Sequence, residues 1–213
     1  MITTGLFGGS FNPAQRGHRS VSRGAIRALG LDELWWLVSP GNPLKPVEGM
    51  APLAARFASA RRMARGLPIR ATAIERELGT RFTVDTLCAL IARFPDRRFI
   101  WIMGADNLAQ FHLWRHWRKI ARTLPIAVVS RPGYDDPALA APAMAWLRRF
   151  VRPAAEAPCW TDWRTPALVL LDLPPDPTSA TGIRAAAPLW HQSEDYSFNP
   201  HTLRDGVTRK VVT

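Results

Sequence analysis

Two adjacent glycines near the start of the chain, Gly8 and Gly9, are the feature that most constrains its fold. An apolar run over Ile2 to Phe7 predicts a strand before them, and a helical pattern over Ser20 to Leu29 follows. Glycine lets backbone approach a ligand closely because it has no Cβ. Backbone N–H groups in such a turn, together with a helix start, form an anion site. His18 is then expected beside a bound phosphate.

The composition describes one domain with a substantial core, because 47% of the 213 residues are hydrophobic and 21% are charged. No run approaches the roughly 20 apolar residues of a membrane helix, and no signal-peptide pattern opens the chain. We therefore expect a cytoplasmic protein without a membrane partner. The net charge of +11 suits polyanions, but the basic residues are scattered, so nucleic acid is not the expected partner. The oligomeric state stays open.

The two cysteines, Cys88 and Cys159, lie far apart and outside any metal-ligand spacing. Neither a disulfide framework nor a zinc site is therefore predicted, and no residue is assigned as a metal ligand. Cys88 falls in an apolar helical pattern and is expected to be buried.

Strand and helix patterns alternate along the chain and predict the α/β class. Further strands are expected over 33–38, 68–74, 98–103, 124–130 and 167–173, with helices over 52–65 and 82–94. This alternation implies parallel strands with right-handed crossovers, and ligands gather where such strands end. The arginines of 52–65 are expected on an outward helix face. Residues 75–81 are interpreted as a polar turn, and 135–164 as a connection with one helical pattern over 140–150.

Candidate binding residues follow the predicted strands. Lys45 comes after the second strand and offers a point charge to a phosphate. Asp106 follows the fourth strand, where it either accepts hydrogen bonds from a ribose or caps a helix. Thr83, or Thr80, stands at a helix start, which favours either a helix cap or an anion site. Trp114 or Trp117 offers a flat face to another ring, and we favour Trp114.

A second phosphate motif lies near the end of the chain, over residues 178–184. Ser179 and Thr181 supply hydroxyl groups at a helix start, and Arg184 stands one helical turn further on. Hydroxyls, free N–H groups and a guanidinium together suit phosphate oxygens, although a capped helix produces the same pattern. The presence of a glycine loop elsewhere in the chain favours the phosphate site.

The complete strings at these positions resemble the nucleotidyltransferase superfamily, and within it the bacterial nicotinate-nucleotide adenylyltransferases. The first string, G-G-S-F-N-P-A-Q-R-G-H, departs from the family pattern at Gln15, where His or Thr is usual. The other strings are P-G-N-P-L-K, R-F-T-V-D-T-L, G-A-D-N, R-P-G and T-S-A-T-G-I-R. The resemblance implies a Rossmann-like, doubly wound parallel sheet with helices on both faces. It covers residues 1–187, and we expect the divergent tail, 188–213, to pack on the same domain.

The reaction implied by the resemblance joins nicotinate mononucleotide to ATP, giving deamido-NAD and pyrophosphate. Mg²⁺ is expected on the ATP phosphates, because it keeps few protein ligands. The implied catalytic residues are His18, Lys45 and Arg184, and the acceptor is assigned to Lys45, Thr83 and Trp114. The implied ATP-binding residues are Gly8, Gly9, Ser10, Phe11, Gln15, His18, Gly104, Asp106, Arg131, Ser179, Thr181 and Arg184.

Two alternatives stay open. One is adenylyl transfer to a different phosphate, such as nicotinamide mononucleotide or phosphopantetheine; Thr83 favours the acid, because an amide gains less from a helix N-terminus. The other is a nucleotide- or RNA-binding protein that has lost catalysis, suggested by Gln15, the altered tail and the positive charge. Salt-sensitive RNA binding without turnover would distinguish it.

Overall fold

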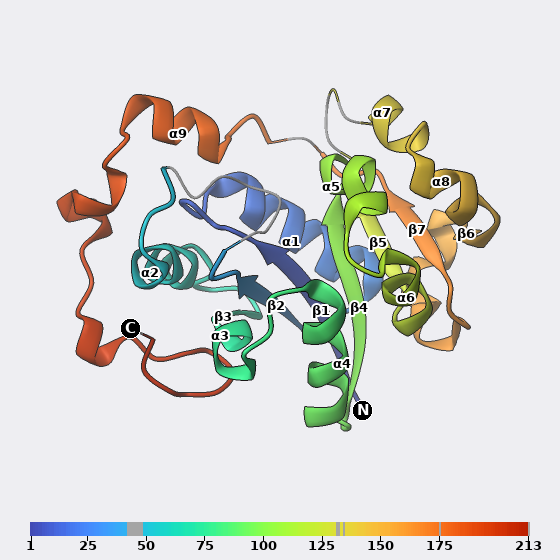
Figure 1. Ribbon diagram of the computed structural model, residues 1–213, viewed down its shortest axis with the longest axis horizontal. Coiled ribbons are helices and arrows are strands. Elements are labelled where there is room, and N and C mark those ends of the chain that lie inside the picture. The colour runs from blue at the N-terminus through green and yellow to red at the C-terminus, as the bar shows by residue number, and fades with distance from the viewer. Residues whose placement is uncertain (42–48, 131–132, 134, 175, 213) are drawn as a thin grey trace.

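A parallel sheet forms the centre of the computed structural model, which describes residues 1–41, 49–130, 133, 135–174 and 176–212 (Figure 1). The described strands are ordered β3-β2-β1-β4-β5-β7-β6, and each neighbouring pair is parallel. Their bounds are β1 Ile2–Gly9, β2 Glu33–Val38, β3 Ile69–Thr72, β4 Arg97–Gly104, β5 Ile126–Val129, β6 Val151–Arg152 and β7 Leu168–Leu171.

Both faces of the sheet are buried, because alternate side chains of a strand enter different core clusters. In β2, Trp35 and Leu37 belong to one cluster, whereas Leu34 and Trp36 belong to the other. Near-continuous apolar strands are typical of parallel sheets covered on both sides. The predicted α/β class with a doubly wound parallel sheet is therefore confirmed.

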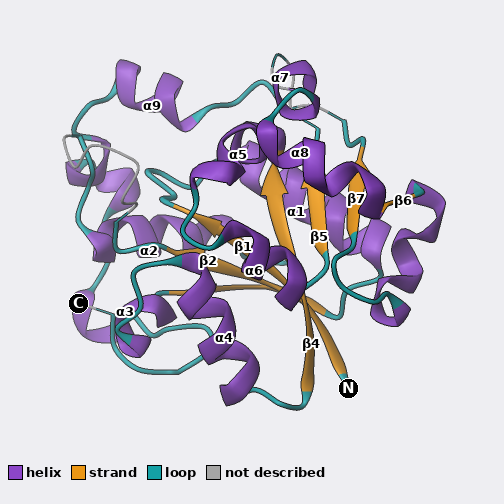
Figure 2. Cartoon of the chain, turned by 45° about the vertical axis from the view of Figure 1, so that its right-hand side comes forward, coloured by secondary structure: helices purple, strands orange, loops and turns teal. Residues whose placement is uncertain are grey.

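Helices cover the two faces in separate groups (Figure 2). One cluster includes buried residues of α3 through α8, and the other includes those of α1, α2 and the 3₁₀ segment η3. The bounds are α1 Arg16–Leu29, α2 Leu53–Met63, α3 Ile74–Leu78, α4 Thr83–Arg93, α5 Ala105–Gln110, η1 Phe111–Leu113, α6 Trp117–Thr123, α7 Asp135–Leu139, α8 Pro142–Leu147, η2 Arg148–Phe150, η3 Ala154–Asp162 and α9 Ala180–Ala186.

The strand order reverses direction at the centre of the sheet. β1 pairs with β2 on one side and with β4 on the other, so the chain runs outward to β3, returns to β4 and then continues towards β7. In open α/β sheets, ligands bind outside the carboxyl ends of the strands at such a switch point. Gly9 and Gly104 end the two strands that flank this point.

Three local features were predicted incorrectly or not at all. The polar turn over 75–81 contains α3, which ends where Gly79 adopts a left-handed conformation with φ of 64°. The one helical pattern expected over 140–150 matches α8, which begins at Pro142, and η2 directly after it, but the connection over 135–164 also contains α7 and η3. Proline lacks an N–H and suits the first turn of a new helix. The edge strand β6, only two residues long, was not predicted at all.

Two expectations about burial also need correction. Cys88 is exposed, although α4 buries its neighbours Val84, Leu87 and Leu90. Arg56 is buried, although the other arginines of α2 are exposed.

The C-terminal segment crosses the molecule after β7. It includes α9, then runs down beside α2 and ends near α3, as Figure 1 shows in orange and red. Asp205 fastens it to the edge of the sheet by accepting hydrogen bonds from the Ala73 N–H at 2.7 Å and the Thr72 hydroxyl at 3.0 Å. Leu203 and Val212 are buried in the core cluster that contains α1 and α2. No helix in the described part of the chain is long and apolar enough to cross a membrane.

Candidate active site

The loop between β1 and α1 keeps its backbone at the strand end by sending one side chain into the core. Phe11 is 1% exposed, stacks on Trp36 with ring centres 5.0 Å apart, and meets Phe7 edge to face at 6.0 Å. Its φ of 47° is unusual for a residue other than glycine. Such backbone persists where the surroundings hold it, here by the packed phenyl ring, and it is common at ligand sites.

The first turn of α1 is closed by a reciprocal pair of hydrogen bonds. Gln15 is the N-cap, and its side-chain oxygen accepts from the Gly17 N–H. The His18 Nδ1 accepts from the Gln15 backbone N–H at 3.1 Å. Because Nδ1 is an acceptor, a neutral His18 ring must carry its proton on Nε2. The helix start therefore fixes which nitrogen of His18 is a donor.

Aromatic rings hold the imidazole of His18 in place. The ring lies 4.9 Å from Phe11, 6.1 Å from Trp36 and 6.2 Å from Phe7, between ring centres. His18 is half-buried among these rings.

The two phosphate motifs meet although 161 residues separate Gly17 from Thr178. The Gly17 N–H donates to the Thr178 hydroxyl at 2.9 Å, and that hydroxyl donates to the Gln15 side-chain oxygen at 2.8 Å. Arg184 donates through Nη1 to the Asn12 carbonyl at 2.6 Å and through Nη2 to the Thr181 hydroxyl at 3.2 Å. The structure thus brings Thr178 and Arg184 of the second motif into contact with the first loop and the start of α1.

The start of α9 is capped by the serine of the second motif. The Ser179 hydroxyl accepts from the Gly182 N–H at 3.0 Å. Just before it, Asp176 accepts from the Thr178 N–H at 2.9 Å and from the Ser20 hydroxyl at 3.1 Å. The hydrogen bonds from Thr178 hold the pKa of Asp176 below its ordinary value.

Two glycines allow close approaches at the ends of β1 and β4. A Cβ on Gly8 would stand 2.7 Å from the Trp101 ring, so that a side chain there would displace the indole. A Cβ on Gly104 would overlap the Asp106 carboxylate, which bends back over the strand end. Asp106 is half-buried in the first turn of α5 and is not its N-cap, which is Gly104.

The two residues predicted to bind the acceptor ring lie on neighbouring elements. Thr83 is the first residue of α4; the N-cap is Phe82, which makes no side-chain cap, so the expected threonine cap was wrong. Trp114, half-buried, meets Trp101 edge to face at 6.2 Å. The guanidinium of Arg115 lies 4.6 Å from the Phe82 ring and links the two positions.

The alternative aromatic residue belongs to the core. Trp117 is 8% exposed and packs edge to face on Trp146 at 5.5 Å between ring centres. The preference for Trp114 is consistent with this burial. Lys45 and Arg131 lie outside the residues that the structure describes, so their predicted roles stay predictions.

The sequence of this chain matches the cytidylyltransferase-like family model over residues 6–186. A relative from Erythrobacter litoralis, named "Probable nicotinate-nucleotide adenylyltransferase", is 61% identical over 211 residues, covering 99% of this chain and 94% of the relative. A relative of the same name from Parvibaculum lavamentivorans is 52% identical over 183 residues, covering 86% and 91%. The chain belongs to the nicotinate-nucleotide adenylyltransferase family.

A solved structure shares the fold of this family member. The nicotinic acid mononucleotide adenylyltransferase of Plasmodium falciparum, complexed with NaAD, aligns with a TM-score of 0.65 over 87% of this chain and 83% of that one. Its sequence identity is 15%, so the likeness concerns the arrangement of sheet and helices.

Sequence reasoning missed three residues that shape the site of this adenylyltransferase. Asn12 is 4% exposed and joins the loop to Gly49, whose carbonyl accepts from its amide at 2.8 Å. Asp176 accepts a hydrogen bond from Thr178 at the start of the second motif. The Asp-Pro-Thr spacing, which is typical of a local hydrogen-bonded turn, could have indicated this contact. Arg56 donates to the Ser10 carbonyl at 2.7 Å. Its signal was its position four residues before the apolar Ala60, on the buried face of α2.

Proposed function

We propose that this chain transfers the adenylyl group of ATP to nicotinate mononucleotide, giving deamido-NAD and pyrophosphate. The observation that carries the proposal is the meeting of both phosphate motifs at the switch point of the sheet, through the contacts of Gln15, Thr178 and Arg184. Membership of the adenylyltransferase family supports the same reaction. ATP is the nucleotide substrate implied by that family.

The proposed chemistry is an in-line displacement at the α-phosphorus of ATP. A phosphate oxygen of the mononucleotide forms the new P–O bond, while the bond from the α-phosphorus to the bridging oxygen of the β-phosphate breaks. Pyrophosphate leaves with that electron pair, and no covalent enzyme intermediate is needed. Such reactions are accelerated mainly by positioning and by stabilising the phosphate charge.

Residues of the first loop and of α1 are proposed to receive the ATP phosphates. The backbone N–H groups of Gly9, Ser10 and Phe11 would contact phosphate oxygens, with Gly8 before them and the Gln15 amide beside them. Nε2 of His18 would donate a hydrogen bond to the phosphate as charge moves to the leaving group.

Residues from two other parts of the sheet are proposed to complete the ATP site. Arg184 and Thr181, with Ser179, would hold the oxygens of the departing pyrophosphate, because a guanidinium and hydroxyls donate strong hydrogen bonds. Asp106, after Gly104, would accept from the ribose hydroxyls. Arg131 would border the adenine.

The start of α4 is proposed to bind the pyridine carboxylate. Thr83 opens an 11-residue helix, whose first N–H groups and dipole favour an anion. Trp114 would stack on the pyridine ring, and Lys45 would contact the mononucleotide phosphate. The contact between Arg115 and Phe82 supports placing the ring and carboxylate sites together.

Mg²⁺ is proposed to arrive on the phosphates of ATP. Mg²⁺ keeps few protein ligands and binds well to the oxygens of substrate phosphates. When bound, the ion would neutralise part of the negative charge of the phosphates. We place the reaction in the cytoplasm, where dissolved ATP is available.

The test is product formation from purified protein, ATP, Mg²⁺ and nicotinate mononucleotide, followed by chromatography. We expect deamido-NAD and pyrophosphate in equal amounts, and no product when a chelator removes Mg²⁺. Pyrophosphate without deamido-NAD, or no product at saturating substrates, would contradict the proposed reaction.

A further inference from the structure

The α2 helix carries a charged side chain into the interior. Arg56 is only 1% exposed, and among the described residues it forms no ion pair with a carboxylate. Burial lowers its pKa to about 10, so the guanidinium stays protonated at neutral pH. A buried charge is unfavourable unless its donors are satisfied. The fold can therefore bury the Arg56 guanidinium only if its N–H groups find hydrogen-bond acceptors.

Backbone carbonyls from three separate segments take those hydrogen bonds. Nη1 donates to Ser10 and Ser39, each at 2.7 Å, and Nη2 donates to Pro40 at 3.2 Å. Nε donates to Ala51 at 2.8 Å. The planar fork of arginine fixes the directions of its donors. One side chain thus sets the relative positions of the chain after β1, the chain after β2 and the approach to α2.

The contact with Ser10 determines where the next N–H points. The Ser10 carbonyl and the Phe11 N–H belong to one planar trans peptide and therefore point in opposite directions. Because the carbonyl is directed at the buried guanidinium, the Phe11 N–H is directed away from it. No acceptor among the described residues takes this N–H, which suits an amide reserved for a ligand.

The contacts with Ser39 and Pro40 extend the same control to the end of β2. The Ser39 N–H donates to the Gly9 carbonyl at 3.0 Å, so the ends of β1 and β2 are joined directly as well as through Arg56. Asn12 adds a parallel link by accepting from the Ala51 N–H at 3.3 Å. Displacement of the guanidinium would therefore release the loop and the neighbouring strand end together.

We infer that Arg56 is a positioning residue for adenylyl transfer: it holds the Ser10 carbonyl so that the Ser10–Phe11 backbone presents its N–H to the phosphates of ATP. In this role Arg56 acts through the backbone carbonyls that it contacts and would not touch the nucleotide itself. The inference rests on the proposed function, because it needs a phosphate ligand at this loop.

The variants Arg56→Lys and Arg56→Met test the inference. Lysine keeps the positive charge, but one ammonium group cannot span carbonyls of three segments. Calorimetry would measure the binding of ATP and of adenosine to each variant without an acceptor. We expect the Kd of ATP to rise roughly tenfold in both variants, the Kd of adenosine to change less than about twofold, and kcat to fall on the order of 100-fold.

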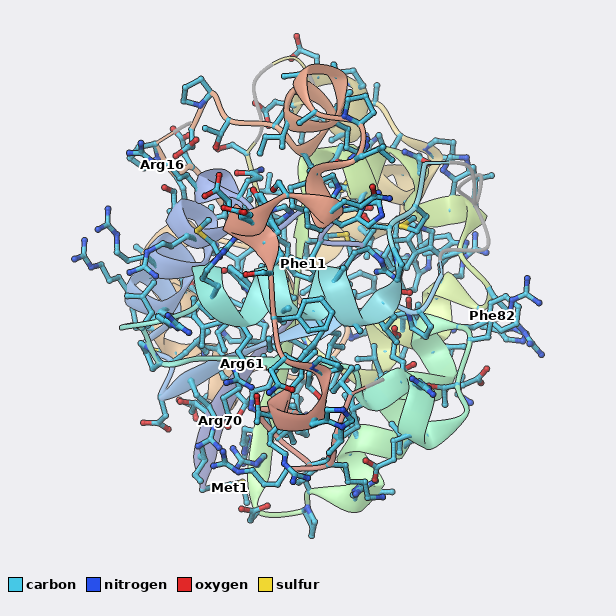
Figure 3. All side chains as sticks on the ribbon, turned by 90° about the vertical axis from the view of Figure 1, so that its left-hand side faces the viewer. Met1, Phe11, Arg16, Arg61, Arg70 and Phe82 are labelled. Carbon is cyan, nitrogen blue, oxygen red and sulfur yellow. The ribbon has the colours of Figure 1, made fainter. Side chains whose placement is uncertain are left out.

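Arg61→Lys and Arg61→Met are the matched controls. Arg61 lies on the same helix but is exposed, and it reaches the Thr202 and Arg204 carbonyls of the C-terminal segment at 3.4 and 3.5 Å (Figure 3). We expect the Kd of ATP and kcat to stay within about twofold of the unaltered protein, because these contacts are long, exposed and weak.

A merely structural role predicts a different result. It would lower the folded fraction and the melting temperature while leaving the Kd of ATP per folded molecule unchanged, and it would let lysine restore kcat. The inference would be overturned by an unchanged Kd of ATP in the Arg56 variants or by a kcat that lysine restores. An equal loss of ATP and adenosine binding would also overturn it. Failure of the proposed function looks different, since the unaltered protein would then bind ATP but make no deamido-NAD.

Discussion

At the residue scale, His18 depends on a backbone contact for its chemistry. Its Nδ1 accepts the Gln15 N–H, so a neutral ring carries its donor N–H on Nε2. The same histidine also completes the cap of α1 and packs on Phe11. A group with both roles connects the start of the helix with the proposed phosphate site.

Replacement of His18 by alanine should separate these roles. We expect His18→Ala to lower kcat about 10²- to 10³-fold, the range for losing one donor to developing charge. Loss of the cap contact should also lower the free energy of unfolding. For a chain of this size, each kcal/mol lost lowers the melting temperature by only about 2–4 °C. Steady-state kinetics and thermal unfolding measure the two effects. The control is His201→Ala, at an exposed position. Turnover within a few-fold of the unaltered protein would refute the role of His18.

Gln15 illustrates why one motif position alone does not decide activity. Its side-chain oxygen accepts hydrogen bonds from Gly17 and Thr178, so it joins the two phosphate motifs through neutral groups. A residue that lacks the charge of histidine therefore still organises the start of α1. Its proposed contact with ATP through the amide N–H₂ stays a prediction.

At the element scale, the junction of α3 and α4 contains a partly buried carboxylate. Glu75 accepts from the Thr86 hydroxyl at 3.2 Å, and burial raises the pKa of this carboxyl above its ordinary value of 4.5. A raised native pKa means that the folded state binds more protons than the unfolded state between 4.5 and that pKa. Stability contributed by Glu75 is therefore lost as the pH rises through this interval.

The variant Glu75→Gln should remove that pH dependence. We expect it to melt above the unaltered protein at pH 8, with the difference shrinking as the pH falls towards 4.5. Thermal unfolding across this pH series is the measurement. Glu77→Gln is the control of opposite sign, since hydrogen bonds from Arg93 and Lys210 outweigh burial and lower the pKa of Glu77. It should be destabilising above pH 4.5, and that loss should disappear at lower pH. A lower melting temperature for Glu75→Gln at pH 8 would contradict the account.

The strands β1 to β5 and β7 could be predicted from the sequence because their segments are mostly apolar. Strand β2 was predicted with its observed bounds, Glu33–Val38, whereas β1 was predicted to end at Phe7 and includes both Gly8 and Gly9. The short pieces were not predictable, because β6 has two residues and α3 five, too few for a periodic signal. Arg56 was misjudged because its burial depends on carbonyls of distant segments.

At the scale of the whole molecule, the C-terminal segment packs against the domain that carries the family motifs. Trp190 packs against Ala51 and Ala55, next to Arg56, and Asp205 fastens the end of the segment to β3. The segment therefore covers the helix whose buried arginine holds the first loop. Its sequence carries none of the six motifs, so their pattern gave no information about these contacts.

The most direct test of the central claim is the rate of Mg²⁺-dependent pyrophosphate release from ATP, with nicotinate mononucleotide and nicotinamide mononucleotide compared as acceptors. The account predicts a kcat/KM at least about tenfold higher for the acid, because a carboxylate gains from the α4 N-terminus at Thr83 and an amide gains less. Equal rates or a preference for the amide would contradict the carboxylate site, and no release with either acceptor would contradict the function itself.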